Sequence, residues 1–124
     1  MNRTLPVLSA ISALLFFGCA KKAATPQDVQ QELQKATASG GVLSAAPPEI
    51  KMAVDQAATA IKNDDQVGAV MSLRNARASG QLTPEQKLSV DDMMAKARGV
   101  LVDRAMRGDQ QAAMQLQMLN QNMR

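Results

Sequence analysis

Apolar residues recur at every third or fourth position through most of this 124-residue chain, and that spacing restricts it to helical folds. The clearest run covers residues 50–61, where one helical face carries Ile50, Ala53, Val54, Ala57, Ala58 and Ile61. No segment alternates for long between apolar and polar residues, and β-branched residues are few. The sequence therefore predicts an all-α fold, a small bundle of antiparallel helix pairs.

Helix start and stop residues divide this pattern into five helical segments. The predicted N-caps are Thr25, Asp65, Thr83 and Asp109. The predicted helix stops are Gly40, Gly80 and Gly108. Thr83 is the strongest of these boundaries, because Pro84 follows it and Gln86 completes a capping box. The helix that begins there is predicted to be the longest, running to about Arg107.

The first helical segment, within residues 26–46, differs from the other four. Its apolar stripe is thin and its composition is rich in Gln and Ala, which fits either a frayed linker or a core helix. Pro47 and Pro48 then form a stiff break. We therefore predict a compact four-helix domain over residues 49–124, preceded over 19–48 by a tether and a weak helix whose order stays open.

The first eighteen residues have the plan of a secretory signal. A short basic start containing Arg3 is followed by thirteen uncharged residues over 5–17. That stretch is too short for a spanning helix, which needs about 20 apolar residues. Residues 1–18 are therefore predicted to be a signal peptide.

The signal ends on Phe16-Phe17-Gly18-Cys19, which resembles the lipobox of bacterial lipoproteins, with Phe16 where Leu is usual. The resemblance implies cleavage between Gly18 and Cys19, and attachment of acyl chains such as palmitate to Cys19. It also implies release to the outer membrane, because Ala20 rather than Asp follows the cysteine. We expect a lipid-anchored protein of the cell envelope that faces the periplasm, with surface exposure left open.

Composition excludes several functional classes. The chain has no His, Trp or Tyr, and its only aromatic residues and its only cysteine lie in the first nineteen positions. It therefore lacks an imidazole for acid–base work, an internal disulfide and the usual zinc ligands. No phosphate-binding loop or Gly-x-Ser-x-Gly motif is present. We predict no enzymatic activity, no cofactor and no metal. The net charge of +3 falls to +2 when Arg3 leaves with the signal, so no nucleic-acid partner is expected.

Residues 49–82 span 34 positions and predict two helices joined by a turn, which resembles a tetratricopeptide repeat. The small and large residues that carry the resemblance are Ala57, Ala60, Ala69, Leu73 and Ala76. It covers about a quarter of the chain and implies a scaffold that binds proteins or peptides. A plain four-helix bundle stays open as the alternative.

A second resemblance lies in Leu82-Thr83-Pro84-Glu85-Gln86, which is similar to the LTxxQ motif of small periplasmic stress chaperones. It implies a protein that binds unfolded clients. Those chaperones generally carry two such motifs, and this chain carries one.

Methionines are concentrated in the last third of the chain, at Met93, Met94, Met106, Met114, Met118 and Met123. Thioethers fill irregular cores, bind copper(I), or form flexible surfaces that accept apolar peptides. The core interpretation is favoured, and the partner-binding candidates are Met114, Leu116, Met118 and Leu119. The sequence thus predicts a membrane-anchored, non-enzymatic module that binds or organises envelope proteins or peptides. A chaperone for unfolded clients and a passive structural spacer are the alternatives.

Overall fold

The computed structural model describes residues 24–124, and within this range the chain is helical with no strand. The helices are α1 (Pro26–Thr37), α2 (Pro48–Lys62), α3 (Gln66–Ala78), α4 (Pro84–Met106) and α5 (Gln110–Asn122). The prediction of an all-α bundle of packed helix pairs is confirmed. The predicted signal peptide, residues 1–18, and the predicted lipidation site, Cys19, lie outside the described residues.

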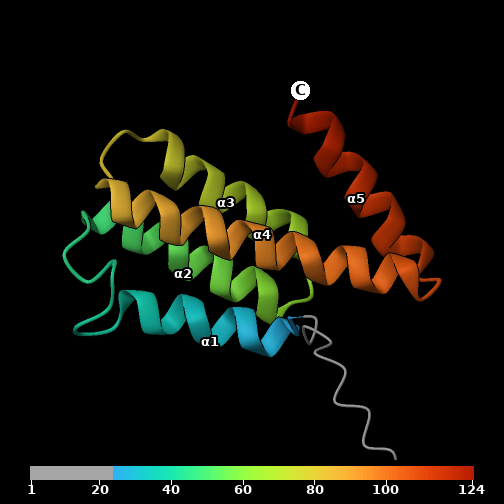
Figure 1. Cartoon of the computed structure of the whole chain (residues 1–124), viewed down its shortest axis with the longest axis horizontal. Helices are drawn as coiled ribbons and strands as arrows, with labels where there is room; N and C mark the ends of the chain where they lie inside the picture. Colours follow the sequence, from blue (N-terminus) through green and yellow to red (C-terminus); the bar gives the residue numbers. More distant parts are fainter. Residues whose placement is uncertain (1–23) are drawn as a thin grey trace, which may run out of the picture.

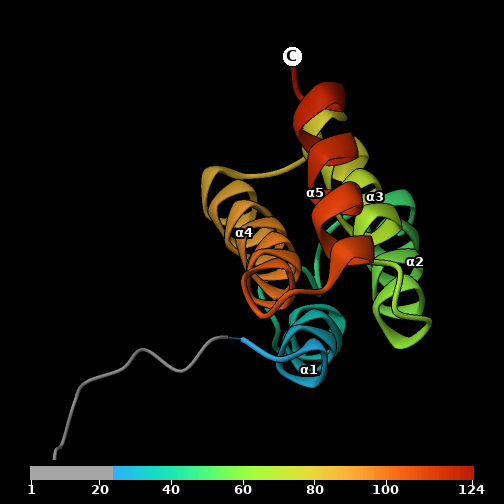
Figure 2. The same ribbon diagram turned by 90° about the vertical axis from the view of Figure 1, so that its right-hand side faces the viewer.

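The first four helices form an up-and-down bundle. Successive helices run antiparallel, each packs on the next, and α1 also packs on α4, so that the four close around one core (Figure 1). The fifth helix starts at the C-terminal end of α4 and leaves it at a steep angle. It packs on α4 and more lightly on α3, on the side away from α1 (Figure 2).

Local capping explains the helix boundaries. Thr83 accepts a hydrogen bond from the backbone N–H of Gln86 at 3.2 Å, and the Gln86 side chain accepts one from the backbone N–H of Thr83 at 3.0 Å. The predicted capping box is therefore confirmed. A similar box joins Thr25 and Asp28 at the start of α1. The other two predicted N-caps, Asp65 and Asp109, also accept backbone N–H bonds.

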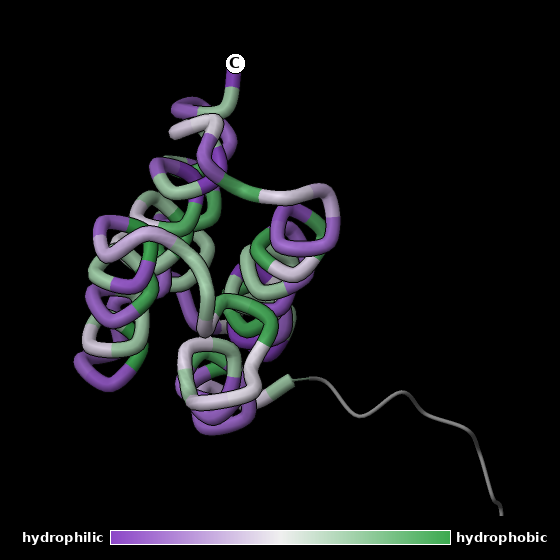
Figure 3. Tube along the Cα trace, turned by 90° about the vertical axis from the view of Figure 1, so that its left-hand side faces the viewer, coloured by the Kyte–Doolittle hydropathy of each residue, from purple (hydrophilic) through white to green (hydrophobic). Residues whose placement is uncertain are grey.

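The hydrophobic core is continuous through the bundle. Apolar residues gather on the sides of the helices that face one another, while polar residues cover the outside (Figure 3). The largest fully buried apolar side chains are Leu33, Leu43, Ile50, Leu73, Met93, Leu101 and Leu119. On α4 the buried positions include Val90, Met93, Ala97 and Leu101, and Met94 is only partly buried, so Met93 rather than Met94 is the core methionine of this helix.

Helix α1 and the segment after it belong to this core. Val29 and Leu33 of α1 are buried, and Leu43 of the connecting segment is buried as well. The connection is also fixed to α4, because Gln86 donates a hydrogen bond from Nε2 to the carbonyl oxygen of Val42 at 3.3 Å. The core thus includes residues on both sides of Pro47 and Pro48.

Candidate binding surface

Helix α5 is the least covered helix of the described chain. Only Ala112 and Leu119 are buried among its thirteen residues. No Asp, Glu, Lys or Arg occurs between Gln110 and Asn122, so every polar side chain on this helix is an amide. The outer side of α5 is therefore neutral and rich in methionine and glutamine.

The four residues predicted to contact a partner divide into two groups. Leu119 is fully buried and Leu116 is partly buried against the core, so both hold α5 in place. Met114 is 60% exposed and Met118 49% exposed. These two methionines lie one helical turn apart and therefore share a face. We call Met114 and Met118 the α5 methionine face.

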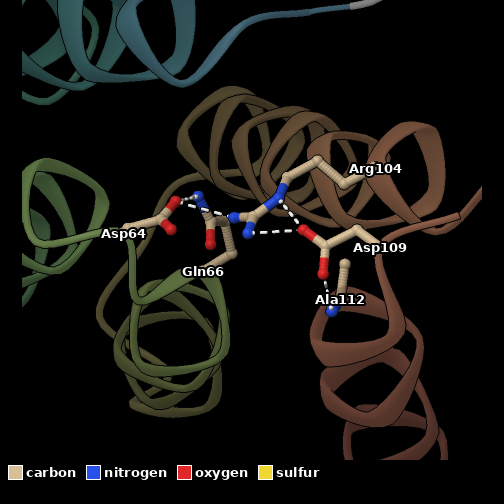
Figure 4. A network of polar contacts seen from close by, with 5 residues as sticks. All are labelled: Asp64, Gln66, Arg104, Asp109 and Ala112. Carbon is tan, nitrogen blue, oxygen red and sulfur yellow. Dashed lines mark hydrogen bonds and ion pairs between the residues drawn. The ribbon is translucent and has the colours of Figure 1, made fainter. Parts of the chain in front are cut away.

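A polar cluster fixes the start of α5 (Figure 4). Arg104 of α4 places Nη1 2.8 Å from the Asp64 carboxylate in the turn between α2 and α3. Its Nη2 lies 2.7 Å from the carboxylate of Asp109, the N-cap of α5. Asp64 also accepts a hydrogen bond from Nε2 of the buried Gln66 at 3.1 Å. One guanidinium thus joins α4, the α2–α3 turn and the first turn of α5.

The ionisation of this cluster follows from its contacts. The backbone N–H of Ala112 and then the Arg104 guanidinium stabilise the Asp109 carboxylate, and its pKa lies below the ordinary value. The hydrogen bond to Asp109, followed by that to Asp64, raises the pKa of Arg104. Asp109 and Arg104 therefore form a charged pair near neutral pH.

Two further arginines hold the C-terminal end of α5. Arg74 of α3 donates a hydrogen bond from Nη1 to the carbonyl oxygen of Asn122 at 2.6 Å. Arg98 of α4 donates from Nη2 to the side-chain oxygen of Asn120 at 2.7 Å. The sequence predicts neither contact, because an arginine 22 or 48 residues away gives no local signal of its acceptor.

The chemistry of this surface is that of a neutral, apolar contact. Among residues 24–124, no three His, Cys, Asp or Glu side chains are grouped so that they could hold a metal ion. None of the five helices is long and apolar enough to cross a membrane. What α5 offers is a pair of flexible thioether side chains surrounded by amides, held at a fixed angle to the bundle.

Comparison with known proteins gives no relative: no protein-family model, no curated protein and no solved structure matches this chain.

Proposed function

We propose that this chain is a lipoprotein, anchored in the outer membrane through Cys19, whose helical domain binds other envelope proteins without catalysing a reaction. The contact surface in this proposal is the α5 methionine face. The anchor rests on the Gly18-Cys19 ending of the signal segment.

The observation that carries the binding proposal is the neutral, half-exposed outer side of α5. Exposed methionines adapt their shape to an apolar partner at little cost in strain. A helix that served only to cover the bundle would normally turn charged residues outward, as α2 does with the exposed Asp55 and α4 does with the exposed Glu85. The α5 methionine face lacks this charged covering.

A matched pair of double variants tests the surface. Met114→Gln with Met118→Gln removes the apolar contact while keeping side-chain length and helix propensity. Met52→Gln with Leu88→Gln makes the same change at two exposed positions on α2 and α4. A photo-crosslinking residue placed at Gln117, on the exposed side of α5, reports partners in intact cells.

We expect discrete crosslinked partners that disappear in the α5 variant and persist in the α2/α4 variant, with unchanged helicity in both. A smear of many clients that is lost in the α5 variant would favour the chaperone alternative. No crosslinks at all, with native helicity, would leave the spacer alternative and reject the binding module.

A second measurement tests the anchor. The mature chain should carry acyl mass at Cys19 and fractionate with the outer membrane. The Cys19→Ser variant should be soluble. A native chain without acyl mass would reject the lipoprotein part of the proposal.

A further inference from the structure

The chain enters the described domain beside the C-terminal half of α4. Ala24, Thr25 and Pro26 line a cavity of about 470 Å³ whose other wall is formed by Val100, Asp103, Arg104 and Arg107 of α4. A membrane anchor on the chain before Ala24 would therefore attach the domain to the membrane at this end of α4.

The same end of α4 carries the most exposed large apolar side chain of residues 24–124. Met106 is 83% exposed, and Val102 lies one turn before it. These two residues, with Ala95, Arg98, Gly99 and Asp103, line a shallow hollow of about 490 Å³ on the outer side of the helix. We call Val102 and Met106 the α4 apolar edge.

Basic residues accompany this edge. Arg107 follows Met106 directly, its side chain is largely exposed, and it forms an ion pair with Asp103 in the preceding turn. Arg98, a second basic residue, lines the hollow itself. An apolar edge next to basic residues is the composition of a surface that rests on anionic lipid.

The length of the tether sets how far this end lies from a lipid anchor. Four residues lie between Cys19 and Ala24, and the five steps along a fully extended chain between these two positions span at most about 18 Å. An anchor at Cys19 thus keeps the α4 apolar edge at a high local concentration near the bilayer, whatever the protein concentration. This argument favours the bilayer over a second copy of the chain as the occupant.

We propose that the α4 apolar edge rests on the membrane, with Met106 inserted at the headgroup level and Arg107 directed toward lipid phosphates. This inference rests on the proposed anchor at Cys19 and adds an orientation to it. The C-terminal end of α4 then faces the membrane, and α5 starts at that end of α4 (Figure 1).

The absence of tryptophan allows a direct test by single-tryptophan depth measurement. Met106→Trp reports on the edge. Leu88→Trp is the matched control, because Leu88 is 70% exposed on the same helix and lies 18 residues, or about 27 Å, from Met106. Each full chain is expressed with its own leader, purified, and reconstituted in vesicles of phosphatidylethanolamine and phosphatidylglycerol with or without brominated acyl chains.

An interfacial side chain lies about 5 to 10 Å into the headgroup region, so brominated lipid should quench Met106→Trp roughly two-fold and shift its emission to the blue. Leu88→Trp should show neither effect. Equal quenching of the two, or quenching of neither, overturns the orientation. A blue shift in Met106→Trp that depends on protein concentration and not on brominated lipid would identify a second copy as the occupant and also overturn it.

Because Cys19 is the only cysteine, the proposed orientation can be tested even if the natural acyl anchor is absent. If the purified chain carries no acyl mass, the proposed anchor fails. The Cys19 thiol is then coupled to a maleimide lipid in the same vesicles, which restores the tether chemically. Quenching of Met106→Trp in that sample supports the α4 apolar edge as a lipid contact, and its absence overturns it.

Discussion

The two terminal helices, α1 and α5, are nearly equal in length, at 12 and 13 residues, yet the bundle uses them differently. Helix α1 packs on both α2 and α4 and buries Val29, Leu33 and Ala36. Helix α5 packs on α4 and lightly on α3, and buries Ala112 and Leu119. The helix with the thinner predicted apolar stripe is therefore the one that completes the core.

The polar contacts that attach the two helices to the rest of the bundle also differ. Helix α1 is joined to α4 by Lys96, whose Nζ lies 2.6 Å from the Glu32 carboxylate and 2.7 Å from that of Asp92. The hydrogen bond to Asp92, followed by that to Glu32, raises the pKa of Lys96. Helix α5 is joined to the bundle by arginine contacts to its N-cap Asp109, to the Asn120 side chain and to the carbonyl oxygen of Asn122. Each of the two helices packs on two neighbours, and they differ in how many apolar side chains they bury there.

The largest expected effect is at the centre of the α1 contact. Leu33→Ala should lower the free energy of unfolding by about 2 to 5 kcal/mol, because it leaves a cavity between packed helices. Urea unfolding followed by far-UV circular dichroism measures the change. The exposed Leu88→Ala should shift it by less than about 0.5 kcal/mol. A Leu33→Ala midpoint equal to the wild-type value would show that α1 is not part of the cooperative unit.

The equivalent change in α5 should act locally. Leu119→Ala should favour opening of α5 by about 2 kcal/mol, because Leu119 is the only large side chain of this helix that is fully buried. Hydrogen exchange by mass spectrometry should then show faster exchange in residues 110–122 and little change in α2 and α3. Uniformly faster exchange in all five helices would contradict a separable α5.

The next effect concerns Arg104, whose side chain is mostly buried and contacts two carboxylates. Arg104→Gln should cost about 1 kcal/mol and should also speed exchange at the start of α5. Arg107→Gln, on the exposed side of the same helix, should cost less than about 0.5 kcal/mol. Equal costs for the two variants would reject Arg104 as the link between the α2–α3 turn and α5.

The smallest expected effect is the acid sensitivity of α5. The pKa of Asp109 is lowered in the folded chain, so the stability that this group contributes is present above its ordinary pKa of 3.8 and is lost as pH falls through the folded value. The pKa of Asp92 beside Lys96 is lowered in the same way, so acid also weakens the α1 attachment. Asp109→Asn keeps an N-cap acceptor but removes the charge.

Hydrogen exchange of α5 should therefore depend less on pH in Asp109→Asn than in the wild type once intrinsic exchange rates are corrected, while α1 keeps its dependence. No histidine is present, so stability should change little between about pH 5 and 8. A steep change of stability in that range would indicate that a group other than Asp92 and Asp109 titrates there.

Local signals were sufficient for the helices themselves. Thr83 with Gln86, and Asp109 with the N–H of Ala112, are contacts within four residues, so the sequence predicts them directly. Burial depends on which helices meet, and the sequence does not contain that information locally. It therefore left α1 undecided and grouped the buried Leu119 with the exposed Met118.

Ion pairing shows the same limit. Opposite charges four residues apart on one helix are expected to pair. Asp103 and Arg107 do so along α4, whereas Asp91 pairs with Arg77 of α3 at 2.6 Å and not with Lys87, four residues before it. The partner across the helix interface is closer than the partner along the helix.

The distribution of methionines has a consequence for oxidative damage. Met93 is enclosed in the core, whereas Met106, Met114 and Met118 present their sulfur atoms at the surface. An oxidant would convert the exposed thioethers to sulfoxides first, which turns flexible apolar groups into polar ones. The fold would survive that chemistry while both proposed contact surfaces lost their apolar character, so the oxidised protein would remain folded and become unable to bind.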